Sequence, residues 1–240
     1  MLLVYSNMVK QRRKTKREIE IPKHASRGRK TAYVLGVDEV GRGPLAGPVT
    51  VCVSKISTGT VSVLKKELRN MAGKPYPVGK DSKKMTEKER EFWFSYLKKA
   101  QKKKLVEFNI ASKSAKHIDT LGISVCIRRL VNSLVSKSMN GVDSEDVILL
   151  ADRGLKADLS IKQQDIVKGD EKEFVISIAS VYAKVTRDMY MKKISKKKEY
   201  TVYGFELHKG YGTKKHRDVI GRIGLGQEHR RSFCKRFTDV

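Results

Sequence analysis

Three carboxylates are the residues of this sequence whose types and positions most clearly allow chemistry. Asp38 and Glu39 are adjacent and come at the end of the apolar run 32–37, and Asp152 ends the apolar run 147–151. Such runs predict short buried strands, and charge at the end of a buried strand is costly unless a counter-charge binds there. Oxygen ligands without histidine or cysteine suit hard cations such as Mg²⁺ or Mn²⁺. We therefore predict a divalent-metal site, for which two ions about 4 Å apart would suit phosphodiester hydrolysis.

A glycine-rich stretch follows the first two carboxylates directly. It contains Gly41, Gly43 and Gly47, with Arg42 between the first two. A dinucleotide-binding loop would open a helix here, but two prolines and the β-rich run 49–53 oppose one, and no Gly-Lys-Ser/Thr ending is present. What remains is a loop whose backbone can approach a ligand closely, with Arg42 able to meet a phosphate. An ordinary turn is the alternative.

Two further acids have competing interpretations. Asp170 and Glu173 have the spacing of a helix N-cap and its capping box, and physical reasoning alone favours this cap over a catalytic role. Asp188 follows Arg187 late in the next predicted helix, and a surface ion pair explains it equally well.

Aromatic and basic residues mix in the C-terminal forty residues. Tyr203, Phe205 and Tyr211 lie among lysines and histidines, which is typical of surfaces that stack on sugars or bases and contact phosphates. The alternative is that one or two of these rings simply pack in the interior. His208, His216 and His229 lack metal-site spacing, and we predict surface roles for them.

The composition points to a polyanionic partner. The 240 residues carry a formal net charge of +26, which predicts nucleic-acid binding; a charge that serves solubility alone is the alternative. Residues 1–30 contain ten bases and two acids, a net +8, and are predicted to form a disordered basic arm.

The cysteine pattern and the apolar runs bear on location. Three widely spaced cysteines without a CxxC pair indicate a reduced, cytoplasmic protein. The apolar start at 1–5 is too short for a signal-peptide core, and no apolar run reaches the roughly 20 residues of a membrane span.

The elements that must position these residues alternate between strands and helices, which predicts an α/β domain over 31–240. The first two strands are joined too closely for a parallel crossover, so they should pair antiparallel within a mixed sheet. Thr86 and Glu89 have capping-box spacing at the start of a helix. Strands are predicted at 32–37, 49–53, 105–111 and 147–151, with a short segment of unassigned structure around Ile166, and helices at 61–68, 86–100, 114–135 and 172–194.

The motifs, taken together and in order, resemble ribonuclease HII of the type 2 ribonucleases H. The resemblance covers about residues 31–235 and rests on several separated segments, which is more specific than any one of them. These segments are Asp38–Val49, Asp81–Lys84, Lys168–Asp170, Ser177–Asp188, His208–Thr213 and His229–Phe233.

This resemblance implies a ribonuclease-H-like fold, with a mixed central sheet flanked by helices and a helical C-terminal part. It also implies a two-metal endonuclease that acts on RNA–DNA hybrids and cuts 5′ to single ribonucleotides in duplex DNA, leaving 3′-hydroxyl and 5′-phosphate ends. A monomeric enzyme that removes ribonucleotides and RNA primers from DNA is the corresponding expectation.

Site roles follow from the resemblance, residue by residue. Asp38, Glu39, Asp152 and Asp170 match the four metal-binding acids, which reverses the capping preference for Asp170, and Asp188 becomes an acid near the site. The loop Gly41-Arg42-Gly43 would sense the ribose 2′-hydroxyl, the group that distinguishes RNA from DNA. Tyr211 would stack on the sugar of the following deoxynucleotide, and Lys83 and Lys168 are candidates for phosphate contacts.

One departure keeps other functions open. The family usually has glycine where this chain has Arg153, a cation beside Asp152 that could loosen a metal or pair with substrate. A hybrid-binding module with impaired catalysis is therefore one alternative, and a junction-resolving or transposase-like nuclease of the same architecture is another. The glycine loop and Tyr211 favour the ribonuclease over the second alternative.

Overall fold

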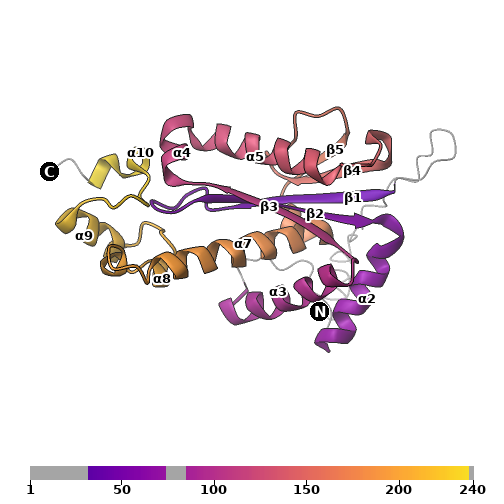
Figure 1. The fold of residues 1–240 in the computed structure, drawn as a ribbon, viewed down its shortest axis with the longest axis horizontal. Coiled ribbons are helices and arrows are strands. Elements are labelled where there is room, and N and C mark those ends of the chain that lie inside the picture. Colours follow the sequence, from indigo (N-terminus) through magenta and orange to yellow (C-terminus); the bar gives the residue numbers. More distant parts are fainter. Residues whose placement is uncertain (1–31, 74–84, 238–240) are drawn as a thin grey trace, which may run out of the picture. The chain divides into compact units, whose positions relative to one another are not determined.

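A five-stranded mixed sheet with helices on both faces forms the fold (Figure 1). The computed structural model describes residues 32–73 and 85–237. The predicted basic arm 1–30 and the segment containing Lys83 lie outside the described residues. No helix in the described ranges is both long enough and apolar enough to cross a membrane.

The sheet has the order β3-β2-β1-β4-β5. β2 pairs antiparallel with β1 and with β3, whereas β4 is parallel to both β1 and β5, so the predicted antiparallel first pair and the mixed sheet are confirmed. The strands are β1 Tyr33–Val40, β2 Val49–Ser57, β3 Glu107–Lys113, β4 Val147–Asp152 and β5 Lys162–Ile166.

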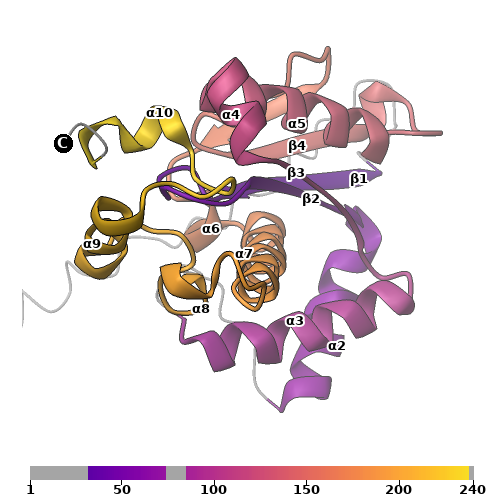
Figure 2. The same cartoon turned by 60° about the vertical axis from the view of Figure 1, so that its left-hand side comes forward.

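Helices cover both faces of the sheet (Figures 1 and 2), and an apolar layer lies between the sheet and the helices on each side. One face packs against α5 and the other against α7, and alternate β1 residues supply the two layers: Leu35 and Val37 to the first, Val34 and Val40 to the second. This is the period of two expected of a strand buried on both sides. The helices of the sheet layers are α2 Val61–Ala72, α3 Glu87–Lys102, α4 Ala115–Leu121, α5 Ile123–Ser138, α6 Gly169–Lys172 and α7 Phe174–Ile194.

The structure corrects two predicted boundaries and one predicted helix cap. β1 extends to Val40, so Asp38 and Glu39 lie within the strand rather than after it. The predicted helix 114–135 is two helices, because Gly122 has φ 80° and ψ 151° between them. The capping role of Asp170 is wrong: Lys168 occupies the N-cap of α6 and Glu173 that of α7. The Thr86–Glu89 capping box that begins α3 is confirmed.

The C-terminal part is helical and has apolar clusters of its own. Its helices are α8 Phe205–His208, α9 Lys214–Ile223 and α10 Arg231–Cys234. Tyr203 and Phe205 pack with Ala46 and Met191 in one buried cluster, and Leu45 packs with α9 and α10 residues in another. Residues of the glycine-rich stretch are therefore part of the core of the C-terminal region.

Candidate functional site

Strand register brings the first three acids to one place. β1 and β4 are adjacent and parallel, and Val37 pairs with Ala151, so Asp38 and Asp152 lie at the same level of neighbouring strands. One carboxylate oxygen from each of Asp38, Glu39 and Asp152 lies within 4.8 Å of the others. The convergence of acids expected from the two apolar runs is thus present.

The electrostatics of this three-acid cluster favour a bound cation. Burial raises the pKa of Asp38 well above its usual range, and the neighbouring charges of Glu39 and Asp152 add to the rise. A hydrogen bond from Ser180 on α7 opposes it. Burial likewise raises the pKa of Glu39, although Arg42 opposes that shift. Carboxylates that repel one another in the interior are stabilised by a positive ion.

Glu39 also has an oxygen available for a ligand. Its Oε1 accepts a hydrogen bond from Arg42 Nε at 2.9 Å, whereas its Oε2 is buried and has no hydrogen-bond partner among the described residues. A buried carboxylate oxygen left unpaired is costly. The acids therefore fit a hard divalent cation by donor type, by mutual repulsion and by this unsatisfied atom.

Asp170 lies beside the cluster rather than within it. It is buried on α6, and its charge contributes to the raised pKa of Asp38. The preceding residue, Gly169, donates its N–H to Asp152 Oδ1 at 2.8 Å. This hydrogen bond ties α6 to the end of β4 and places Asp170 next to the three acids.

The glycine loop, residues 41–48, connects β1 to β2 and is held by the C-terminal region. The N–H groups of Leu45 and Ala46 donate to the carbonyl of Gly210 at 2.9 and 3.2 Å, and Gly47 N–H donates to Glu228 at 2.8 Å. Arg230 N–H in turn donates to the Leu45 carbonyl at 2.8 Å. The loop is therefore fixed on both sides by segments more than 160 residues further along the chain.

Of the three aromatic residues proposed as stacking candidates, only Tyr211 is exposed. Tyr203 and Phe205 are buried, so the packing alternative is correct for these two. Tyr211 is 40% exposed, and its ring centre lies 5.9 Å from both Lys184 Nζ and the Arg187 guanidinium.

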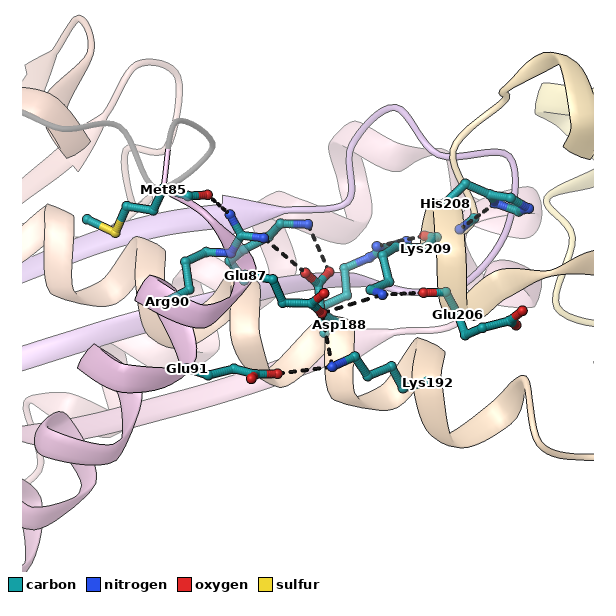
Figure 3. Close-up of polar contacts among 12 residues, drawn as sticks. Met85, Glu87, Arg90, Glu91, Asp188, Lys192, Glu206, His208 and Lys209 are labelled. Atoms are coloured by element: carbon teal, nitrogen blue, oxygen red, sulfur yellow. Dashed lines mark hydrogen bonds and ion pairs between the residues drawn. The ribbon is translucent and has the colours of Figure 1, made fainter.

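Asp188 belongs to a separate network of charges between α3 and α7, and a neighbouring ion pair of Lys209 with Glu87 joins the segment before Tyr211 to α3 (Figure 3). Lys184 donates to Asp188 at 2.8 Å, and Arg90 lies 3.9 Å from its other oxygen. Lys209 Nζ donates to the Glu206 carbonyl. Asp188 therefore forms an ion pair, as one of the two interpretations predicted, and its partners are Lys184 and Arg90. The ion pair lies in the interior and not on the surface, because Asp188 is buried where α3 covers α7.

The remaining sequence candidates have simpler surroundings. Lys168 is exposed and has the left-handed backbone conformation, with φ 56°. Arg153 is exposed and, within the ranges described, forms no ion pair with Asp152. Beside the glycine loop, a cavity of about 350 Å³ is lined in part by the basic residues Arg42, Arg128 and Lys156.

Sequence reasoning misplaced two histidines and missed two arginines. His216 and His229 are buried, not on the surface, and their Nε2 atoms lie 3.0 Å apart. Arg187 and Arg230 are buried as well. The runs Thr186-Arg187-Asp188 and His229-Arg230-Arg231 show no periodicity that would have indicated burial of these polar side chains.

Comparisons with known proteins agree on one family. A family model described as Ribonuclease HII matches residues 35–237. Ribonuclease HII of Bacillus cytotoxicus is 36% identical over 231 residues, which is 94% of this chain and 80% of that protein.

Two solved structures are similar in fold. Ribonuclease H2 from Pyrococcus horikoshii OT3 aligns with a TM-score of 0.61 at 22% identity, covering 87% of this chain and all of that one. A structure described as Bst-RNase HIII in complex with Mn²⁺ aligns with a TM-score of 0.57 at 15% identity, covering 85% of this chain and 65% of the other. At these identities the likeness concerns the fold, which is the predicted ribonuclease-H-like arrangement.

Proposed function

The chain belongs to the ribonuclease HII family and is a ribonuclease-H-type endonuclease, and on this premise we propose what it cuts. It hydrolyses the RNA strand of RNA–DNA hybrids and cuts 5′ to a single ribonucleotide embedded in duplex DNA. The products carry 3′-hydroxyl and 5′-phosphate ends. Its role is the removal of misplaced ribonucleotides and RNA primers from DNA.

The observation that carries this proposal is the three-acid cluster at the end of β1 and β4. Asp38, Glu39 and Asp152 would hold the metal, with Asp170 as the fourth acid. Two bound divalent cations, Mg²⁺ or Mn²⁺, would supply an activated water and stabilise the leaving oxygen. The Mn²⁺ complex of the Bst-RNase HIII structure supports this choice of ion for a protein of the same fold.

The surrounding residues bind and orient the substrate. Arg42 holds Glu39 by its side chain, while the backbone of Gly41-Arg42-Gly43 contacts the ribose 2′-hydroxyl. Tyr211, the exposed ring, stacks on the sugar of the next deoxynucleotide.

Three further cations and the buried Asp188 have lesser roles. Lys83, Lys168 and the exposed Arg153 contact phosphates, which suits a polyanionic substrate. Asp188, held by Lys184 and Arg90, acts near the site by fixing the surroundings of Tyr211 rather than by binding metal. We also propose that the protein works as a monomer in the cytoplasm; its cysteines Cys52, Cys126 and Cys234 are free and buried.

The test is a nicking assay on three duplexes: a DNA duplex with one ribonucleotide, the same duplex without it, and an RNA–DNA hybrid. Each is incubated in Mg²⁺, in Mn²⁺ and in EDTA, and the cut position is mapped on a sequencing gel. We expect a single nick 5′ to the ribonucleotide, cleavage of the hybrid, and no cleavage of the all-DNA duplex or in EDTA.

Two results would contradict the proposal. Equal nicking of the ribonucleotide-containing and all-DNA duplexes would indicate a nuclease that does not recognise ribose. Selective binding without nicking in either metal would indicate a hybrid-binding module with impaired catalysis.

A further inference from the structure

Arg187 of α7 directs its whole guanidinium at backbone carbonyls of the glycine loop and its neighbour. Nε donates to Pro48 at 2.9 Å, Nη2 to Ala46 at 3.1 Å and Nη1 to Lys209 at 3.0 Å. The Arg187 side chain is 1% exposed. One residue thus joins the end of the loop to the segment that leads to Tyr211.

Arg230 also directs its whole guanidinium at backbone carbonyls, two of them at the start of the loop. Its Nε donates to Gly47 at 3.0 Å, Nη1 to Arg42 at 3.0 Å and Nη2 to Gly41 at 2.6 Å. It is fully buried. The two arginines therefore bind five of the eight carbonyls of the glycine loop.

Neither arginine is paired with an acid in the described part of the chain. All six of their side-chain hydrogen bonds go to carbonyl oxygens. Burial and the nearby charge of Arg187 lower the pKa of Arg230 to about 9, so that it remains charged at neutral pH. Five of these six acceptor carbonyls belong to the glycine loop, so the burial of the two cations depends on the conformation of that loop.

The orientation of these carbonyls determines what the loop presents to a ligand. In a trans peptide the C=O and the following N–H point in opposite directions. Because the carbonyls of Gly41 and Arg42 face Arg230, the N–H groups of Arg42 and Gly43 face away from it. Neither N–H donates a hydrogen bond to another described residue. Two adjacent donors are therefore available on the face of the loop opposite the arginines.

The glycines flanking this turn leave room for the Arg187 guanidinium. A Cβ at Gly41, which has φ +91°, would lie 2.4 Å from Arg187 Nε, and one at Gly47 would lie 3.3 Å from Arg187 Nη2. At Gly43 a Cβ would meet nothing within 4 Å. The loop backbone is thus packed against the arginines on one side and open on the other.

We infer that Arg187 and Arg230 are positioning residues for ribose recognition, which fix the glycine loop so that the Arg42 and Gly43 N–H groups face the substrate. The inference rests on the proposed function, in which this loop contacts the 2′-hydroxyl. Arginine is required because its planar fork supplies three donors in fixed directions, whereas lysine offers a single mobile ammonium group. A substitution should therefore reduce discrimination between ribose and deoxyribose more than it reduces binding to DNA as such.

The experiment measures discrimination as a ratio, which a partly unfolded sample does not change. In a cleavage-deficient Asp38→Asn background, fluorescence anisotropy gives the Kd of a duplex with one ribonucleotide and of the matched all-DNA duplex. We expect R187M and R230M each to reduce the preference for the ribonucleotide about tenfold, the loss of roughly one good hydrogen bond. Affinity for the all-DNA duplex should change far less. R222M, which removes an exposed arginine charge from α9, should keep the parent's preference.

Lysine variants distinguish the loss of the arginine hydrogen bonds from the loss of the positive charge. They remain informative if the methionine variants fail to fold. R187K and R230K retain the charge but lose the fork, and we expect them to reduce the preference as well. Full preference in both lysine variants would overturn the inference, as would unchanged preference in the methionine variants. If the parent itself does not prefer the ribonucleotide, the proposed function fails instead, so the two failures are distinguishable.

Discussion

At the scale of single residues, position within a sheet decides what each acid can do. Asp38 and Asp152 could be predicted to meet, because both lie at the ends of apolar strands and strand ends converge. The place of Asp170 could not be predicted from physical reasoning alone, since its spacing to Glu173 equally fits a helix cap. The burial of Arg230 could not be predicted, because it depends on hydrogen bonds to a loop more than 160 residues away. The burial of His216 could not be predicted either, because it depends on tertiary contacts with Phe205 and His229.

The repulsion within the three-acid cluster gives a prediction about Asp38. Asp38→Asn removes a buried charge next to Glu39 and Asp152 at nearly constant volume, so cleavage should be lost while the metal-free protein becomes more stable. We expect a higher melting temperature than wild type in EDTA, and a smaller further rise when Mg²⁺ is added. A variant that is no more stable in EDTA, or that retains full cleavage, would remove Asp38 from the proposed metal site.

The glycine loop gives a matched pair of substitutions. Gly41→Ala places a Cβ 2.4 Å from Arg187 Nε and 2.7 Å from the Pro48 carbonyl, in a backbone conformation that alanine adopts poorly. It should lower both stability and cleavage. Gly43→Ala meets nothing within 4 Å, so thermal stability should stay near wild type while cleavage at a single ribonucleotide falls, because the new methyl lies on the substrate side. If Gly41→Ala and Gly43→Ala lowered thermal stability equally, Gly41 could not be assigned to the arginine side of the loop and Gly43 to the substrate side.

At the scale of elements, the sequence predicted most of the sheet and helices but not how the C-terminal part is used. Period-two and apolar-run patterns located the strands, and short connections determined the antiparallel first pair. What the patterns lacked is the contact of Gly210 and residues 228–230 with the glycine loop, which is made by backbone atoms and the buried Arg230 side chain. Such contacts have no hydrophobic period to reveal them.

The histidine pair that joins α9 to residues 226–230 should make the fold sensitive to acid. Burial lowers the pKa of His216 and of His229 to about 4, below the usual 6.5, so the unfolded chain binds more protons between these values. Stability is therefore fully present above pH 6.5 and is lost as pH falls toward 4, at up to roughly 1.4 kcal/mol per pH unit for each group.

Urea unfolding at pH 7.0, 6.0 and 5.0 measures this loss. We expect the midpoint to fall steadily over this range, and to fall less in a variant in which His216 is replaced by glutamine. His117→Asn, at an exposed position of α4, should leave the slope as in wild type. A midpoint that does not change between pH 7.0 and 5.0 would contradict neutral burial of the pair.

At the scale of the whole molecule, acids and bases have separate tasks. The four acids proposed for the metal site are a small share of the 26 carboxylates, whereas 52 lysines and arginines give the chain its net +26. That excess attracts nucleic acid from any direction and does not depend on sequence or sugar. In the proposed function, selection between RNA and DNA comes from the neutral backbone of the glycine loop, so affinity and discrimination should respond to different changes.

Deleting residues 1–30, which carry a net +8, tests this separation. Each phosphate contact that the arm makes releases counterions and adds about 0.9 to the slope of log K against log salt. We expect a flatter salt dependence and weaker binding of every duplex at low salt, with the preference for a ribonucleotide and the cleavage rate at saturating substrate unchanged. A full-length variant with the arm's ten basic residues replaced by glutamine should behave like the deletion, because charge rather than length is responsible. An unchanged slope in both would mean that the arm does not contact phosphates, and a lost preference would mean that it contributes to recognition of the sugar.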